Sequence, residues 1–188
     1  MRIFNVAKIG VLLLCILLVL PMMTGCANEL REQKDDAEIK QEQLEQIEQE
    51  WGAVMKNEND YVTKIEIRSY THQPPTVVDI QPSQEKTCTD VDQIAEIIDL
   101  FESQEHSFEN LPENEESFEA YSTSKYGKKV YAIVFFDSQD QKIMRITIYE
   151  DNNVEVYEPY PGGWQSVCIV RISKPIFETV KGFFDNLE

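Results

Sequence analysis

The stretch KKVYAIVFFDSQDQKIMRITIYE, residues 128–150, decides the fold. Its first part, 128–137, is apolar over most of its length, which is typical of a central strand covered on both faces. Its second part, 142–150, alternates apolar residues that face the core with Arg145 and Thr147, which are expected to face outward. The polar DSQDQ segment between the two parts is typical of a turn. The stretch therefore predicts an antiparallel hairpin at the centre of a sheet.

Further strands are expected on both sides of this hairpin. Residues 151–153 (DNN) tolerate the left-handed backbone of a tight turn. Strands are predicted over 153–158 and 165–172, where a glycine pair between them lets the chain reverse. Upstream, 61–70 has the alternation of a strand, and 76–80 is a second, less regular candidate.

Two amphipathic helices accompany the strands. Asp90 is a good N-cap residue with Gln93 three positions later, a pattern that resembles a capping box. Near the C-terminus, Ser173 is expected to cap a helix with Pro175 in its first turn. The apolar face of the first helix is Val91, Ile94, Ile97, Ile98, Leu100 and Phe101, and that of the second is Ile176, Phe177, Val180, Phe183, Phe184 and Leu187.

This order of elements predicts an α+β domain over residues 61–188. Hairpin-length turns favour an antiparallel meander sheet of four to five strands, with two helices packed on one face. Residues 102–127 are expected to form an acidic loop, because seven glutamates and no base fall between 102 and 119.

Residues 26–60 are expected to form an acidic helical tether in front of the domain. Leu44, Ile47, Trp51 and Val54 recur at helical spacing, which predicts a helix over about 37–56. The apolar stripe is too short for a stable coiled-coil seam, so we favour docking of Trp51 and Val54 on the domain over self-association.

Residues 1–25 have the features of a secretory signal peptide, with Arg2 and Lys8 before an uncharged core over 9–20. That core is short for a helix that spans a membrane. An uncleaved segment that anchors the chain, or an ordinary signal peptide with a chance cysteine, are the alternatives.

The residues Met23-Thr24-Gly25-Cys26 resemble the lipobox of bacterial lipoproteins. The resemblance implies that a diacylglycerol is attached to the Cys26 sulfur and that a dedicated peptidase cuts in front of this residue. Two acyl chains can hold a soluble domain at a membrane. The resemblance therefore implies a lipid anchor on the extracytoplasmic face of the cell membrane, and the plain tether suits a cell of Gram-positive type.

The charge argues against binding to nucleic acid. The chain has 17 Lys and Arg against 34 Asp and Glu, a net charge of −17, whereas phosphate contacts need a basic surface. No catalytic or nucleotide-binding motif is present. His72 and His106 have no second ligand at metal-binding spacing. We therefore expect no cofactor, no metal and no catalysis.

Two groups of residues leave alternatives open. Cys88 and Cys168 are either a disulfide, which export would favour, or two buried free thiols. Tyr157, Tyr160 and Trp164 surround the glycine pair and could form a contact surface. Large aromatic residues are mostly buried, so Trp164 as a plug at the end of the core is the favoured alternative.

The sequence thus predicts a lipid-anchored, non-catalytic binding or interaction protein of the bacterial cell envelope. Its partner would be a protein or the cell wall, and its oligomeric state is not indicated. An accessory subunit of a membrane complex, which contacts its partners through the tether helix, is the main alternative. A metal-binding protein or an enzyme that uses the acidic loop is a further one.

Overall fold

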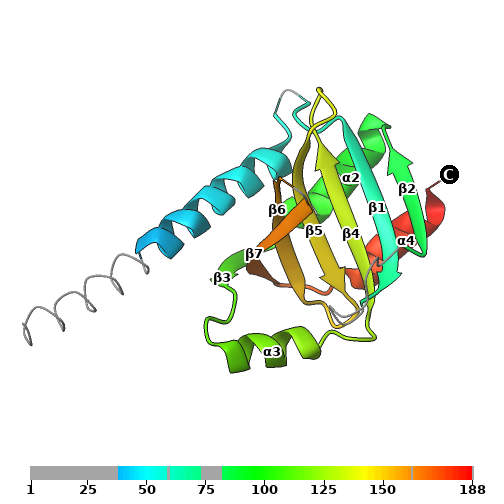
Figure 1. The fold of residues 1–188 in the computed structure, drawn as a ribbon. Coiled ribbons are helices and arrows are strands. Elements are labelled where there is room, and N and C mark those ends of the chain that lie inside the picture. The colour runs from blue at the N-terminus through cyan, green and yellow to red at the C-terminus, as the bar shows by residue number, and fades with distance from the viewer. Residues whose placement is uncertain (1–37, 59, 73–81, 162, 188) are drawn as a thin grey trace, which may run out of the picture. The chain divides into compact units, whose positions relative to one another are not determined.

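A seven-stranded sheet, antiparallel at every pairing, forms the centre of the fold (Figure 1). The structure is a computed structural model, and it describes residues 38–58, 60–72, 82–161 and 163–187. The strand order is β2-β1-β4-β5-β6-β7-β3. The strands are β1 (Lys64–Thr71), β2 (Gln84–Cys88), β3 (His106–Asn110), β4 (Lys129–Phe136), β5 (Lys142–Tyr149), β6 (Val154–Tyr160) and β7 (Gly163–Ile172).

The predicted central hairpin is confirmed as β4 and β5. Every residue of β4 after Lys129 is buried, so both faces of this strand are covered. The Asp137 carboxylate accepts hydrogen bonds from the backbone N–H groups of Gln139 and Gln141, which fixes the turn. Thr147 was expected to face outward and is instead fully buried, because the second face of the sheet is also covered here.

The α+β class is confirmed, but the sheet has more strands than the four to five expected. The additional strands β2 (QEKTC) and β3 (HSFEN) lie at the two edges of the sheet. Both are short and polar, so they lack the apolar alternation by which strands are recognised in a sequence. Backbone pairing with β1 and β7 holds them in place. The strand expected over 76–80 lies outside the described residues.

The segment 102–127 is not the loop that was predicted. It contains the edge strand β3 and the helix α3 (Glu115–Thr123), which Asn114 caps through the backbone N–H of Ser117. No residue of α3 is buried, and a helix without a buried apolar face gives no hydrophobic periodicity to detect.

The helices α2 (Val91–Glu102) and α4 (Phe177–Asn186) pack on one face of the sheet, as expected. Asp90 caps α2 by accepting a hydrogen bond from the Gln93 N–H. Ser173 does not cap α4. The Oδ1 atom of Asn152, in the turn between β5 and β6, accepts hydrogen bonds from the N–H groups of Ile176 and Phe177 instead.

The helix over residues 38–56 contributes to the same core. The chain divides at Leu44, and Leu44–Glu188 forms one unit, so this unit begins earlier than residue 61. Trp51 is 2% exposed, and its ring lies 5.7 Å from the Phe101 and Phe108 rings. The apolar stripe is therefore used within the chain. It is not available as a coiled-coil seam, and the predicted docking of Trp51 and Val54 is confirmed.

The disulfide considered between Cys88 and Cys168 is not formed. Both thiols are free and buried. Cys88 ends β2 at one edge of the sheet, and Cys168 lies in β7, five strands away. Neighbouring strands are about 4.8 Å apart, so the separation is on the order of 20 Å, whereas a disulfide needs Cα atoms within about 7 Å.

We predict that Trp51→Ala destabilises the domain by about 3–5 kcal/mol, because it removes a large buried side chain. The matched control is Gln49→Ala, an exposed position on the same helix, which should change stability by no more than about 0.5 kcal/mol. Urea unfolding measures both. Equal stability of the two variants would show that the helix does not dock.

We also predict that Cys88 and Cys168 resist alkylation in the native protein. Burial raises the pKa of both thiols, that of Cys168 to about 12, and the thiolate is the reactive form. In urea without reductant, both should react with iodoacetamide, as peptide mapping will show. Labelling that requires a reductant in urea would instead demonstrate a disulfide.

Candidate functional site

A buried polar cluster lies on the second face of the sheet, on the side of α3. We call it the Glu155 cluster, and it consists of Tyr121, Lys125, Tyr149, Glu155 and Tyr157. Glu155 is 2% exposed and Lys125 is 3% exposed. The two form an ion pair that joins the segment after α3 to the central part of the sheet.

The Glu155 carboxylate is saturated with hydrogen bonds. Lys125 and Tyr121 donate to Oε1, the latter at 2.6 Å, and Tyr149 and Tyr157 donate to Oε2. A carboxylate offers about four acceptor positions. All of them are occupied by the protein itself, so Glu155 has no free lone pair for a proton or a metal ion.

Burial decides the protonation of the groups around Glu155. It raises the pKa of Tyr121, Tyr149 and Tyr157, that of Tyr149 to about 12, so these hydroxyls stay protonated and donate. Burial also lowers the pKa of the Lys125 ammonium, which the negative charge of Asp151 partly opposes. The Lys125 ammonium also lies 3.3 Å from the centre of the Tyr121 ring, a cation–π contact that favours its charged form.

A cavity of about 90 Å³ adjoins the cluster, and Ser166 lines it together with His72 and Phe118. The buried Ser166 hydroxyl has no hydrogen-bond partner in the protein. A bulge after Val156 in the β6–β7 pairing places Ser166 opposite Tyr157. A buried polar group of this kind is commonly satisfied by ordered water, so the cavity does not by itself indicate a ligand.

Two of the three predicted aromatic contact residues, Tyr157 and Trp164, have described side chains, and neither is fully exposed. Tyr157 is half-buried, its hydroxyl bonded to Glu155 and its ring 4.9 Å from the Arg145 guanidinium. Trp164 lies within β7, paired with Pro159, and is half-buried. The side chain of Tyr160 lies outside the described part of the chain.

Each of the two histidines packs against aromatic rings. His106 packs against Trp51 and Phe108, with ring centres 5.5 and 5.4 Å apart. His72 stacks on Tyr126, and burial lowers its pKa. Within the described ranges, no group of three or more His, Cys, Asp or Glu residues could hold a metal ion.

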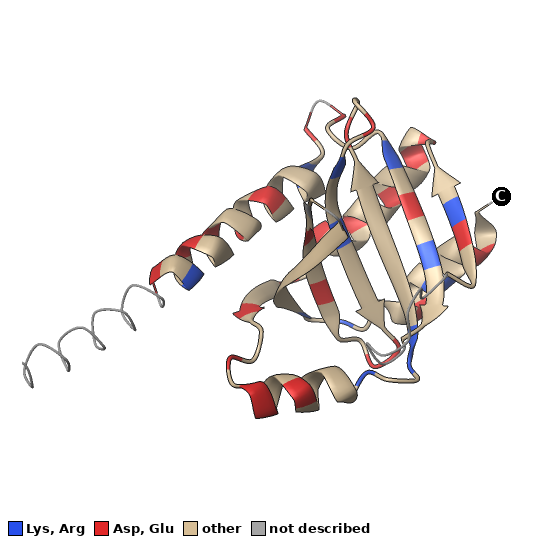
Figure 2. Cartoon of the chain, in the orientation of Figure 1, with Lys and Arg blue, Asp and Glu red and all other residues tan. Residues whose placement is uncertain are grey.

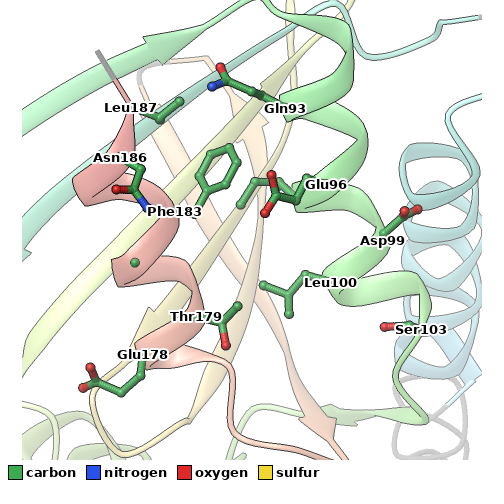
Figure 3. Close-up of a pocket in the computed structure, with 12 residues that line it drawn as sticks. Gln93, Glu96, Asp99, Leu100, Ser103, Glu178, Thr179, Phe183, Asn186 and Leu187 are labelled. Atoms are coloured by element: carbon green, nitrogen blue, oxygen red, sulfur yellow. The ribbon is translucent and has the colours of Figure 1, made fainter.

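A groove of about 630 Å³ lies between α2 and α4 (Figure 3). We call it the α2–α4 groove. The two helices run antiparallel along it, with Gln93 near Leu187 at one end and Leu100 near Thr179 towards the other. Its apolar lining is Ile97, Leu100, Phe183 and Leu187, and its acidic lining is Glu96, Asp99 and Glu178.

The charged side chains that line this groove are acidic, and Lys181 of α4 lies beside it, paired with Glu178 at 3.5 Å. Figure 2 shows acidic positions along α2, which carries no Lys or Arg, whereas α4 carries Lys181. No basic residue is among the described residues that line the α2–α4 groove. An apolar floor between acidic side chains suits a ligand that combines apolar groups with positive charge. Both helices were predicted from the sequence, but the groove between them depends on how they pack on the sheet.

We predict strong energetic coupling within the Glu155 cluster. Removing one partner of a buried ion pair leaves an uncompensated buried charge, so Lys125→Met and Glu155→Gln should each destabilise. The double variant should be less unstable than the sum of the two by about 1–3 kcal/mol. Urea unfolding of the four proteins measures this coupling.

The matched control is the exposed pair Arg171–Glu109, whose side chains are 52% and 47% exposed. The corresponding cycle, with Arg171→Met and Glu109→Gln, should give at most about 1 kcal/mol. Additive effects at Lys125 and Glu155 would contradict the role assigned to the buried pair.

The α2–α4 groove is thus the feature best suited to binding a partner, and the Glu155 cluster is best explained as an anchor for the segment around α3. Among the described residues, no helix combines the length and the apolar character that crossing a membrane requires. No protein-family model, no curated protein and no solved structure matches the chain.

Proposed function

We propose that this chain is a lipid-anchored binding protein of the bacterial cell envelope, held through Cys26 on the extracytoplasmic face of the membrane. The observation that carries the proposal is the motif Met23-Thr24-Gly25-Cys26, which follows an uncharged apolar segment and precedes a strongly acidic one. Two acyl chains on Cys26 would hold a domain of this size at a membrane.

The position of the domain in the chain is compatible with such an anchor. Residues 27–37, between the proposed lipid site and the described helix, can span at most about 40 Å. With the helical residues 38–43 before the unit that begins at Leu44, the domain would stay within roughly 50 Å of the membrane surface. Its partners would be proteins or polymers within that reach.

A binding role without catalysis is supported by the chemistry of the polar groups. Among the described residues, the most deeply buried carboxylate is that of Glu155, and its acceptor positions are filled by Lys125 and three tyrosines. The two histidines pack against aromatic rings. The α2–α4 groove, in contrast, presents apolar and acidic side chains to the outside.

The alternative of an accessory subunit that contacts its partners through the tether helix has less support. Ile47, Trp51 and Val54 are each 2% exposed, since they pack in the core of the chain's own domain. A partner would have to use the polar side of this helix.

The test of the anchor is the intact mass of the protein from a detergent-solubilised membrane fraction. We expect a chain that begins at Cys26 and carries a diacylglyceryl group. Cys26→Ser should abolish this form, whereas the matched control Cys15→Ser, within the apolar segment, should leave it unchanged. A wild-type mass that retains residues 1–25, or an unlipidated product in the medium, would overturn the proposal.

A further inference from the structure

We propose that the α2–α4 groove docks a cationic amphipathic helix of a partner protein. This inference rests on the proposed role as a binding protein and names the kind of partner. Leu100 and Phe183 line the groove and are half-buried, and Ile97 and Leu187 are buried behind them. Half-buried apolar side chains in a groove are what an amphipathic helix covers with its own apolar face.

The charge of the groove selects a basic occupant. Glu96, Asp99 and Glu178 line it and are exposed, and Glu178 also pairs with Lys181 of α4 at 3.5 Å. Lys and Arg side chains beside the apolar stripe of a partner helix would complement these carboxylates. A second copy of this chain, with a net charge of −17, and an anionic lipid surface would both be repelled.

Gly182 lines the groove without a side chain. It lies inside α4, where glycine is less favourable than alanine. A Cβ atom added at Gly182 would meet no other atom within 4 Å, and its backbone has no positive φ that would require glycine. Neither packing nor backbone conformation requires a glycine here, so a larger side chain can enter the groove at this position without a clash.

The dimensions also fit a short helical segment. At about 1.5 Å per residue, the 12 residues of α2 and the 10 residues of α4 run for roughly 15–18 Å. Three turns of a partner helix have this length and would place apolar anchors at positions i, i+3 or i+4, and i+7.

The test is a fluorescence polarisation titration of the purified full chain in mild detergent. The probe is a labelled 14-residue peptide of leucine and lysine, LKKLLKLLKKLLKL, which is helical and amphipathic by design. A peptide of the same composition with a scrambled order controls for charge alone, and detergent without protein is the blank. We expect saturable binding of the probe and at least about tenfold weaker binding of the scrambled peptide.

Two pairs of variants test whether binding occurs in the groove. Gly182→Leu fills the groove without a change of charge and should weaken binding at least about tenfold. The control is Gly52→Leu, because Gly52 is a helical glycine with equally open surroundings outside the α2–α4 groove. This control should leave the affinity within about twofold of the wild type. Glu96→Lys should weaken binding more than Glu48→Lys, which makes the same charge change on the helix over 38–56.

Equal effects of the paired variants, or binding of the scrambled peptide as strong as that of the probe, would overturn the proposal. Thermal unfolding of Gly182→Leu should show unchanged or higher stability, since glycine is the poorer helix former. The Glu96→Lys pair keeps the test decisive if Gly182→Leu does not fold. A Cys26→Ser chain that loses its anchor would titrate unchanged, so this inference and the proposed function fail separately.

Discussion

The central strand β4 has no side that faces water, and the rest of the structure follows from this constraint. A strand that is apolar at nearly every position needs a cover on both faces of its sheet. The first face is covered by α2, α4 and the helix over residues 38–56, all through apolar side chains. On the second face, the chain at α3 reaches the sheet at the Glu155 cluster, and no residue of α3 is buried. The segment at α3 is held by polar contacts from Tyr121 and Lys125 to the saturated carboxylate of Glu155.

The first face of the sheet is covered through apolar contacts and the second is held through polar ones. The α2–α4 groove belongs to the first face and the Glu155 cluster to the second. An apolar cover tolerates variation in packing. Its outer surface between α2 and α4 has room at Gly182, which has no side chain. A buried ion pair is demanding in geometry and gives little net stability. The Glu155 cluster therefore specifies where the α3 segment lies, and the groove on the opposite face remains open to a partner.

The sequence predicted the elements that have strong periodicity. The β4–β5 hairpin, the Asp90 cap and the apolar faces of α2 and α4 are where the alternation and the 3.6-residue spacing placed them. The elements that were missed, β2, β3 and α3, are polar, and contacts with distant parts of the chain hold them. Glu155 gave no signal among the many acidic residues, because its role depends on Tyr121 and Lys125 from a segment predicted to be a loop. Ser173 was preferred as the cap of α4 on local grounds, whereas the real cap, Asn152, is more than 20 residues away in the chain.

The short turn between β5 and β6 connects the two covers. Asp151 forms an ion pair with Lys128, close in the chain to α3, and the adjacent Asn152 holds the first N–H groups of α4 on the other face. Asn152 has a φ of 61°, so the position of its side chain depends on a left-handed backbone. Hairpin turns are ordinarily where a chain accepts insertions. Here a single added residue would shift both attachments at once, so the length of this turn is constrained as tightly as the core.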